Sequence, residues 1–261
     1  MFRAALALPV LLLLLVSPAL AVFGGKPVGS GDPVARSLAA VLYRDATGAH
    51  LCTAVVLAPR LVLTAAHCTA GDRNDMKVIF STGLSGVPAE RLRGVAAVAR
   101  AQATPEAKGS FAYNNPDDIA LVLLDSAAPA DIRTARLAAT PSGSVRIAGY
   151  GATSDLRRAS AFGKQQLGFG QGLRAATATL QPKGALFVAG QGNGTGMCTG
   201  DSGGPAFVAG KDGLSVVGLL IGVSAPRGAA DYCRGTAWFT SIPRWAGWID
   251  TSARKLGVPL P

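Results

Sequence analysis

Residues 197–205 read MCTGDSGGP and carry more information about the fold than any other stretch of the 261-residue chain. They place Ser202 in a glycine-rich turn, with an aspartate before it and a cysteine four residues upstream. Two further blocks lie upstream, LTAAHC at residues 63–68 and DDIAL at residues 117–121. The three blocks supply a histidine, an aspartate and a serine in that order, which are the groups that an activated serine nucleophile requires.

These blocks resemble the chymotrypsin/trypsin-like serine proteases, and the resemblance covers most of the chain after about residue 22. It implies that Ser202 is the nucleophile, that His67 is its general base and that Asp118 orients the imidazole. Asp117 is the adjacent alternative, and on a strand its side chain would point to the opposite face. The motif match favours Asp118.

The same resemblance assigns roles to the residues around the serine. The backbone N–H groups of Gly200 and Ser202 would form the oxyanion hole. Asp201 would pair with the free α-amino group of a mature chain that begins at Val22, in a VFGG start. Cleavage of an export signal after Ala21 would itself create that terminus.

The resemblance is less decisive about the substrate pocket. Gly196 stands at the pocket base, where an acid would be needed to bind an arginine or lysine side chain. Ala237 and Val223 are expected to line the walls. The register of the wall strand, residues 219–224, stays open, because another alignment puts Ser224 where the family has a serine that supports the catalytic aspartate. We therefore expect small or medium apolar residues before the scissile bond.

Four cysteines in an exported chain predict two disulfides, for which three pairings exist. The family pattern selects Cys52–Cys68 and Cys198–Cys233. Metal binding is the alternative, and the dispersed spacing without a Cys-x-x-Cys motif disfavours it. We expect no metal and no cofactor.

The first 21 residues have the features of a secretory signal: Arg3 at the start, an apolar run over residues 6–16 and a small-x-small site over residues 19–21. A membrane anchor is the alternative, but the run is shorter than the roughly 20 residues that a span needs. The expected protein is therefore secreted or periplasmic, with a protease domain over residues 22–261. The signal and the two-disulfide pattern point to a bacterial source.

Short apolar runs separated by turn residues predict an all-β protein. The resemblance specifies two packed six-stranded antiparallel β-barrels, connected near residues 127–144. Pro243 and Gly257 bound a helical segment, which predicts a short C-terminal helix over residues 243–256. The runs expected as strands are 41–43, 54–57, 61–64, 77–80, 95–99, 119–124, 144–149, 177–180, 185–189, 205–208, 214–223 and 236–241.

The composition narrows the partners. The net charge is +10, from 25 basic and 15 acidic residues, but the charges are scattered and the aromatic content is 6%. This pattern indicates a solvated basic protein and no nucleic-acid partner. We expect polypeptide substrates, a protein inhibitor, a monomer, and no membrane contact after signal removal. His50, the second histidine, is expected to be non-catalytic.

The leading hypothesis is a secreted serine endopeptidase that works through an acyl-enzyme. The main alternative is a catalytically silent binding or regulatory protein on the same fold, because a fold does not fix a function. A structural cell-envelope protein is a third alternative, and the intact triad counts against it.

Overall fold

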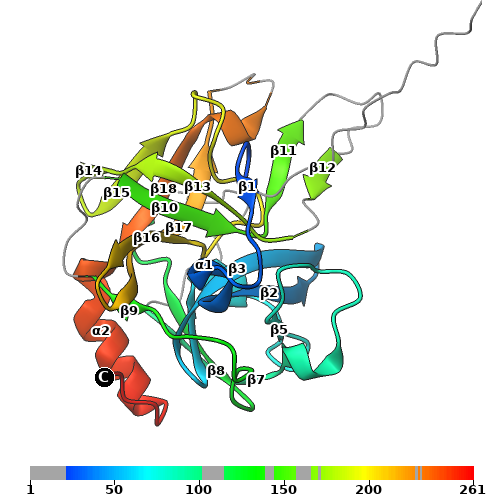
Figure 1. Cartoon of the computed structure of the whole chain (residues 1–261), viewed down its shortest axis with the longest axis vertical. Coiled ribbons are helices and arrows are strands. Elements are labelled where there is room, and N and C mark those ends of the chain that lie inside the picture. The colour runs from blue at the N-terminus through cyan, green and yellow to red at the C-terminus, as the bar shows by residue number, and fades with distance from the viewer. Residues whose placement is uncertain are drawn as a thin grey trace, which may run out of the picture.

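The computed structural model describes residues 22–101, 115–138, 144–156, 166–169, 172–226, 229 and 231–261. The expected signal peptide, residues 1–21, lies outside these residues, as does part of the expected connection. The described chain forms two large sheets, one small hairpin and few helices (Figure 1). The helical segments are α1 (Pro33–Arg36), α2 (Ile242–Lys255) and the 3-10 turns η1 (Ala66–Thr69), η2 (Ala89–Arg91) and η3 (Tyr232–Arg234).

The first sheet is built from the N-terminal half of the described chain. Its order is β6-β5-β2-β3-β4-β8-β7, and all its pairs are antiparallel. The outermost strands, β6 and β7, are separated by Gly94 alone, so the sheet curls round until its edges meet. The strands are β2 (Leu38–Asp45), β3 (Gly48–Ala58), β4 (Leu61–Thr64), β5 (Lys77–Ile79), β6 (Leu92–Arg93), β7 (Val95–Arg100) and β8 (Ala120–Leu124).

The second sheet has the order β1-β13-β10-β16-β17-β18-β15-β14, with β9 paired in parallel to β17. Strands β13 and β14, near its two edges, are separated by one residue and curl this sheet too. Its strands are β1 (Lys26–Pro27), β9 (Arg136–Leu137), β10 (Ser144–Gly149), β13 (Arg174–Thr179), β14 (Gln181–Lys183), β15 (Leu186–Gly190), β16 (Pro205–Gly210), β17 (Gly213–Ser224) and β18 (Thr236–Ser241). The separate hairpin pairs β11 (Ala152–Leu156) with β12 (Gln166–Phe169).

The all-β, chymotrypsin-like fold expected from the sequence is confirmed. The described sheets have seven and nine strands, where six each were expected. The additional strands are β6, β1, β9 and β14, each only two or three residues long. Such short segments pair at the margins of a sheet and carry too few residues to show an alternating pattern in the sequence.

Apolar side chains on both faces of the first sheet explain its continuous apolar runs. Along β2, Leu38 and Ala40 join one core cluster, whereas Ala39 and Val41 join another. Successive side chains of a strand point to opposite faces, so both faces of this strand are buried. The first of these clusters also contains Phe207 and other residues of the second sheet, and it therefore forms the interface between the two sheets.

Helix α2 closes one side of this shared core. Ile242, Ile249 and Ala253 are fully buried in it, and the helix runs at the lower left of Figure 1. Gly257 follows the helix with a φ of 74°, a conformation that ends helices and favours glycine. The helix expected over residues 243–256 is confirmed, with each end displaced by one residue.

Within the described residues, no helix combines the length and the apolar character that a membrane span needs.

The shared core contains one buried polar atom without a partner among the described residues, the hydroxyl oxygen of Tyr150. Because such a group keeps its full desolvation cost, Tyr150→Phe is expected to raise the free energy of unfolding by about 1 kcal/mol. Tyr232→Phe is the matched control: its hydroxyl donates to the Val223 carbonyl, so its removal should cost about 0.5–1.5 kcal/mol. Urea unfolding of both variants checks this, and a destabilised Tyr150→Phe protein contradicts it.

Candidate active site

A cavity of about 290 Å³ lies where the two sheets meet, and both sheets supply its walls. The first sheet and η1 contribute Tyr43, His50, Leu51, Cys52 and His67. The second half of the chain contributes Cys198, Thr199, Gly200, Ser202, Gly222, Val223 and Tyr232. The histidine and the serine singled out in the sequence therefore share one cavity.

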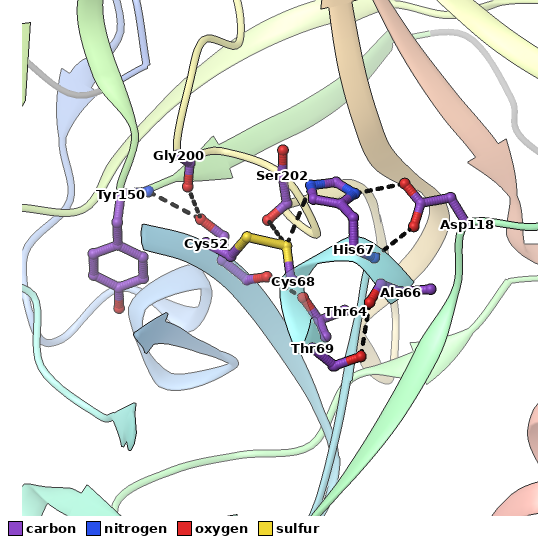
Figure 2. The surroundings of a disulfide bond; sticks show 11 residues. Cys52, Thr64, Ala66, His67, Cys68, Thr69, Asp118, Tyr150, Gly200 and Ser202 are labelled. Carbon is purple, nitrogen blue, oxygen red and sulfur yellow. Dashed lines mark hydrogen bonds and ion pairs between the residues drawn. A yellow bond between two sulfur atoms is a disulfide. The ribbon is translucent and has the colours of Figure 1, made fainter. Parts of the chain in front are cut away.

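His67 is held by Asp118 through two hydrogen bonds. Its ring Nδ1 lies 2.6 Å from Oδ2 of Asp118, and its backbone N–H donates to Oδ1 at 2.9 Å. The carboxylate thus fixes both the backbone and the ring of the histidine. A proton on Nδ1 makes the Nε2 atom the acceptor of the ring, and this atom lies 3.6 Å from the Cys68 sulfur. Figure 2 shows the imidazole between Asp118 and Ser202.

The loop before β8 determines which aspartate reaches the histidine. Thr240 and Trp245 both donate to the Pro116 carbonyl, at 2.6 and 3.0 Å. Asp117 lies 3.8 Å from Arg244 of helix α2. Of the two aspartates left open by the sequence, Asp118 is the one that contacts His67.

The turn that carries Ser202 depends on glycine at positions 200 and 203. Gly200 and Gly203 have φ angles of 93° and 78°, in the region that favours glycine. A Cβ on Gly203 would lie 2.2 Å from the carbonyl oxygen of Thr53. In the described part of the chain, neither the Gly200 N–H nor the Ser202 N–H has an acceptor. Both donors are therefore available to a ligand at the cavity.

Thr53, fully buried on β3, connects this turn to the first sheet. Its N–H donates to the Ser202 carbonyl at 2.8 Å, and its hydroxyl donates to the Gly200 carbonyl at 3.3 Å. Its hydroxyl also accepts from the Tyr150 N–H at 3.2 Å, and its carbonyl accepts from Thr64 at 2.8 Å. One threonine thus positions the serine turn against the strand that precedes the histidine block.

The two disulfides flank the cavity. Cys52 is bonded to Cys68, and Cys198 to Cys233, with Cα–Cα distances of 6.0 and 4.8 Å. The pairing agrees with the one that the family pattern implies. The sulfurs of Cys52 and Cys68 lie close to His67, but a disulfide offers no thiolate, so this group is a poor metal site.

Asp201 is fully buried behind the serine turn. Its carboxylate accepts the N–H of Gly151 at 2.7 Å and that of Cys198 at 2.8 Å. Burial raises the pKa of Asp201 from 3.8 to about 7 and outweighs these two hydrogen bonds. No described basic side chain forms an ion pair with it. Val22, the expected mature terminus, is also fully buried and packs in the same cluster as Met197.

Of the three residues expected in the substrate pocket, one lines the cavity and two do not. Val223 lines the cavity together with Gly222, whereas Gly196 and Ala237 do not belong to its lining. Ala237 is fully buried and pairs with Val223 across β17 and β18. Gly196 is buried and forms an isolated antiparallel bridge with Phe23.

The pairing of β17 with β18 has an irregularity at Ile221, and this irregularity determines which residues of the two strands lie opposite each other after it. Gly222 pairs with Trp238 and Val223 with Ala237, which agrees with the alignment that puts Val223 at the wall. The Trp238 Nε1–H donates a hydrogen bond to the Ser224 hydroxyl oxygen at 2.7 Å. Ile221 is fully buried. Within the described residues, both hydrogen-bond donors to Asp118 belong to His67, and Ser224 is not one of the donors.

His50, the second histidine, lines the cavity, and its ring contacts Asp45 and Tyr43. Its Nε2 is 2.8 Å from Asp45, and its ring stacks on Tyr43 with centroids 4.8 Å apart. Burial and nearby carboxylates raise the pKa of Tyr43 to about 12, so its hydroxyl stays neutral. Sequence reasoning missed Tyr43, Leu51 and Tyr232 as lining residues. Leu51 and Tyr232 each precede a cysteine, which could have indicated them, whereas Tyr43 carries no such signal in the sequence.

The role of Thr53 can be tested by removing its hydroxyl. Thr53→Val keeps the shape but leaves the Tyr150 N–H and the Gly200 carbonyl unpaired, so the free energy of unfolding should fall by about 1–3 kcal/mol. Thr179→Val, on an exposed strand position, is the matched control and should change little. Chemical denaturation distinguishes the two, and equal effects would contradict the assigned role.

The raised pKa of Asp201 predicts how the stability of the fold changes with pH. Because its pKa in the folded chain lies above the value of 3.8, the folded state holds the proton more tightly. The stability of the chain with residues 1–21 attached should therefore fall as the pH rises from about 4 to about 7. A chain that begins at Val22 would place an ammonium near the carboxylate, lower its pKa and remove this fall.

Thermal unfolding of both chains between pH 4 and 8 measures the difference. Asp201→Asn is the control, since it should abolish the pH dependence in the longer chain. The same dependence in both chains would mean that the new terminus does not reach Asp201.

Comparison with known proteins agrees with this geometry. The family model described as Trypsin matches residues 28–249. Among solved structures, the scabies mite inactivated protease paralogue S-I1 is similar, with a TM-score of 0.63 and 20% sequence identity. The match covers 88% of this chain and 99% of that chain and concerns the fold alone. A search of curated proteins found no match. The extent of the family match makes this chain a member of the trypsin family.

Proposed function

We propose that the protein is a secreted serine endopeptidase that hydrolyses peptide bonds through Ser202, His67 and Asp118. The observation that carries the proposal is the 2.6 Å contact between His67 Nδ1 and Asp118, in a cavity that Ser202 also lines. The trypsin family acts on polypeptides, and the chain retains all three residue types at the motif positions.

In this mechanism the Ser202 hydroxyl attacks the scissile carbonyl while His67 Nε2 takes its proton. Asp118 holds the ring in the required tautomer and stabilises the imidazolium that forms. The N–H groups of Gly200 and Ser202, which have no acceptor among the described residues, would bind the oxyanion of the tetrahedral intermediate. The imidazolium then protonates the leaving amine, and water attacks the resulting acyl-enzyme by the reverse sequence.

The proposal extends to activation. Removal of residues 1–21 would free the amino group of Val22, and the buried carboxylate of Asp201 would be its partner. The raised pKa of Asp201 supports this step, because an uncompensated buried carboxylate is unfavourable near neutral pH. The activity would then decline at alkaline pH as the amine, whose ordinary pKa is about 7.7–8.0, loses its proton.

We also propose that the enzyme prefers small or medium apolar residues before the scissile bond. None of the residues that line the cavity is an acid, so a bound arginine or lysine would be desolvated without a counter-charge. Val223 contributes an apolar side chain to the cavity lining. Polypeptides are the expected substrates, with a protein inhibitor as a further partner, and a monomer in the periplasm or outside the cell as the expected state.

A catalytically silent protein on the same fold is the second candidate. The similar mite protein is itself described as inactivated, and a likeness of fold does not separate the two possibilities. The hydrogen-bonded Asp118–His67 pair favours the active enzyme, because a silent protein would have no need of it.

Neighbouring aspartates provide the test. Asp118→Asn is expected to lower kcat by roughly 10⁴-fold, because an amide cannot hold the imidazole in the required tautomer. Asp117→Asn, which alters only the contact with Arg244, should leave kcat nearly unchanged. Hydrolysis of a peptide p-nitroanilide by the mature protein measures both. Equal rates for the two variants, or no hydrolysis by a folded protein that begins at Val22, would favour the silent alternative.

A further inference from the structure

Behind the cavity wall lies a buried polar side chain that the proposed mechanism does not use. Gln191 follows β15 and is 2% exposed. Its amide nitrogen donates to the carbonyls of Met197 and Cys233, at 2.9 and 2.8 Å. Its amide oxygen accepts the N–H of Met197. The carboxamide is therefore fully engaged inside the protein and faces no solvent.

The groups that Gln191 binds are direct neighbours of the cavity lining. Met197 precedes Cys198, and Cys233 follows Tyr232, and both Cys198 and Tyr232 line the cavity. The Cys198–Cys233 disulfide joins the same two segments. Gln191 thus fills the space behind the wall that this disulfide closes.

Gly196 shows how completely that space is filled. A Cβ at this position would lie 2.2 Å from both Cδ and Oε1 of Gln191. The glycine has no unusual φ, so the contact with Gln191 is the feature that requires it. The cavity stops short of both residues, since neither belongs to its lining.

We propose that Gln191 is a specificity-determining residue that sets the depth of the cavity, because its carboxamide occupies the volume into which a large substrate side chain would extend. The inference rests on the proposed function and deepens it. The side chain before the scissile bond would then meet a closed wall of Cys198, Val223 and Tyr232, and large side chains would not fit.

A purely structural role for Gln191 makes a different prediction. If its hydrogen bonds alone mattered, Gln191→Ala and Gln191→Leu would act alike, since both remove them. If its volume sets the depth, only alanine opens the space, because leucine nearly preserves the bulk of glutamine. Gln181→Ala, at an exposed position of β14, controls for loss of a glutamine elsewhere.

The first experiment measures kcat and KM of the mature protein on tetrapeptide p-nitroanilides with Ala, Val, Leu or Phe before the scissile bond. Gln191→Ala should raise the ratio of kcat/KM for Phe to that for Ala by at least about 10-fold, mainly through a lower KM for Phe. Gln191→Leu and Gln181→Ala should keep the wild-type ratio. An unchanged ratio in Gln191→Ala, or the same change in Gln191→Leu, overturns the inference.

The second experiment needs no activity. Gly196→Ala should lower the melting temperature far more than Gly192→Ala, whose Cβ would meet nothing within 4 Å. Gln191→Asn, which shortens the side chain by one methylene, should relieve most of the loss when combined with Gly196→Ala. Equal melting temperatures for Gly196→Ala and Gly192→Ala overturn the inference even if Gln191→Ala fails to fold.

The two experiments separate the inference from the proposed function. A wild-type protein that cleaves none of the four substrates rejects the proposed function, whereas the melting temperatures still decide whether Gln191 fills the space behind the wall. A protein that cleaves them with a ratio insensitive to Gln191→Ala keeps the proposed function and rejects the inference.

Discussion

The hydrogen bond from the Thr53 N–H to the Ser202 carbonyl joins the serine turn to the first sheet, and the rest of the site depends on it. Cys52, the preceding residue, is bonded to Cys68, which is next to His67. His67 is in turn held at two atoms by Asp118. A short series of covalent and hydrogen-bonded contacts therefore connects serine, histidine and aspartate. Since every step is buried or partly buried, the surrounding framework and the contact between Asp118 and His67 together set the relative positions of the three side chains.

Two buried carboxylates lie near Ser202, and the protein treats them differently. Asp118 contacts His67, which lines the cavity, and accepts two hydrogen bonds from it. Asp201 is turned away from the solvent and receives only two backbone N–H groups, and burial raises its pKa to about 7. A carboxylate that is this poorly compensated is a place where an additional positive charge would stabilise the fold. This difference in surroundings is consistent with the two roles proposed above, support of the histidine for Asp118 and pairing with a new amino terminus for Asp201.

Much of the fold and the site could be predicted from local sequence. The blocks around His67, Asp118 and Ser202 identified a family, and the continuous apolar runs indicated strands because both faces of β2 are buried. Of Asp117 and Asp118, the motif match favours Asp118, and its carboxylate accepts the two hydrogen bonds from His67 that the described residues show. Their catalytic roles stay predictions.

Other features depend on tertiary packing and left no signal in the sequence. The irregularity at Ile221 decides which residues of β17 reach the cavity, and no residue pattern marks it. Gly196 and Ala237, expected in the substrate pocket, are not among the residues that line the described cavity, and their role in substrate binding stays a prediction. Gly196 packs against Gln191, whose side chain donates to the carbonyls of Met197 and Cys233. In the sequence, Gln191 lies in a glycine-rich run that is typical of a loop, so these contacts could not be predicted.

If these contacts assemble a working nucleophile, Ser202 should react covalently with a probe for activated serines. The mature protein is treated with a fluorophosphonate probe, and mass spectrometry locates the modified residue. We expect modification at Ser202 in the wild-type protein and its loss in His67→Ala. A folded protein that begins at Val22 and stays unlabelled, or one that is labelled equally without His67, would contradict it.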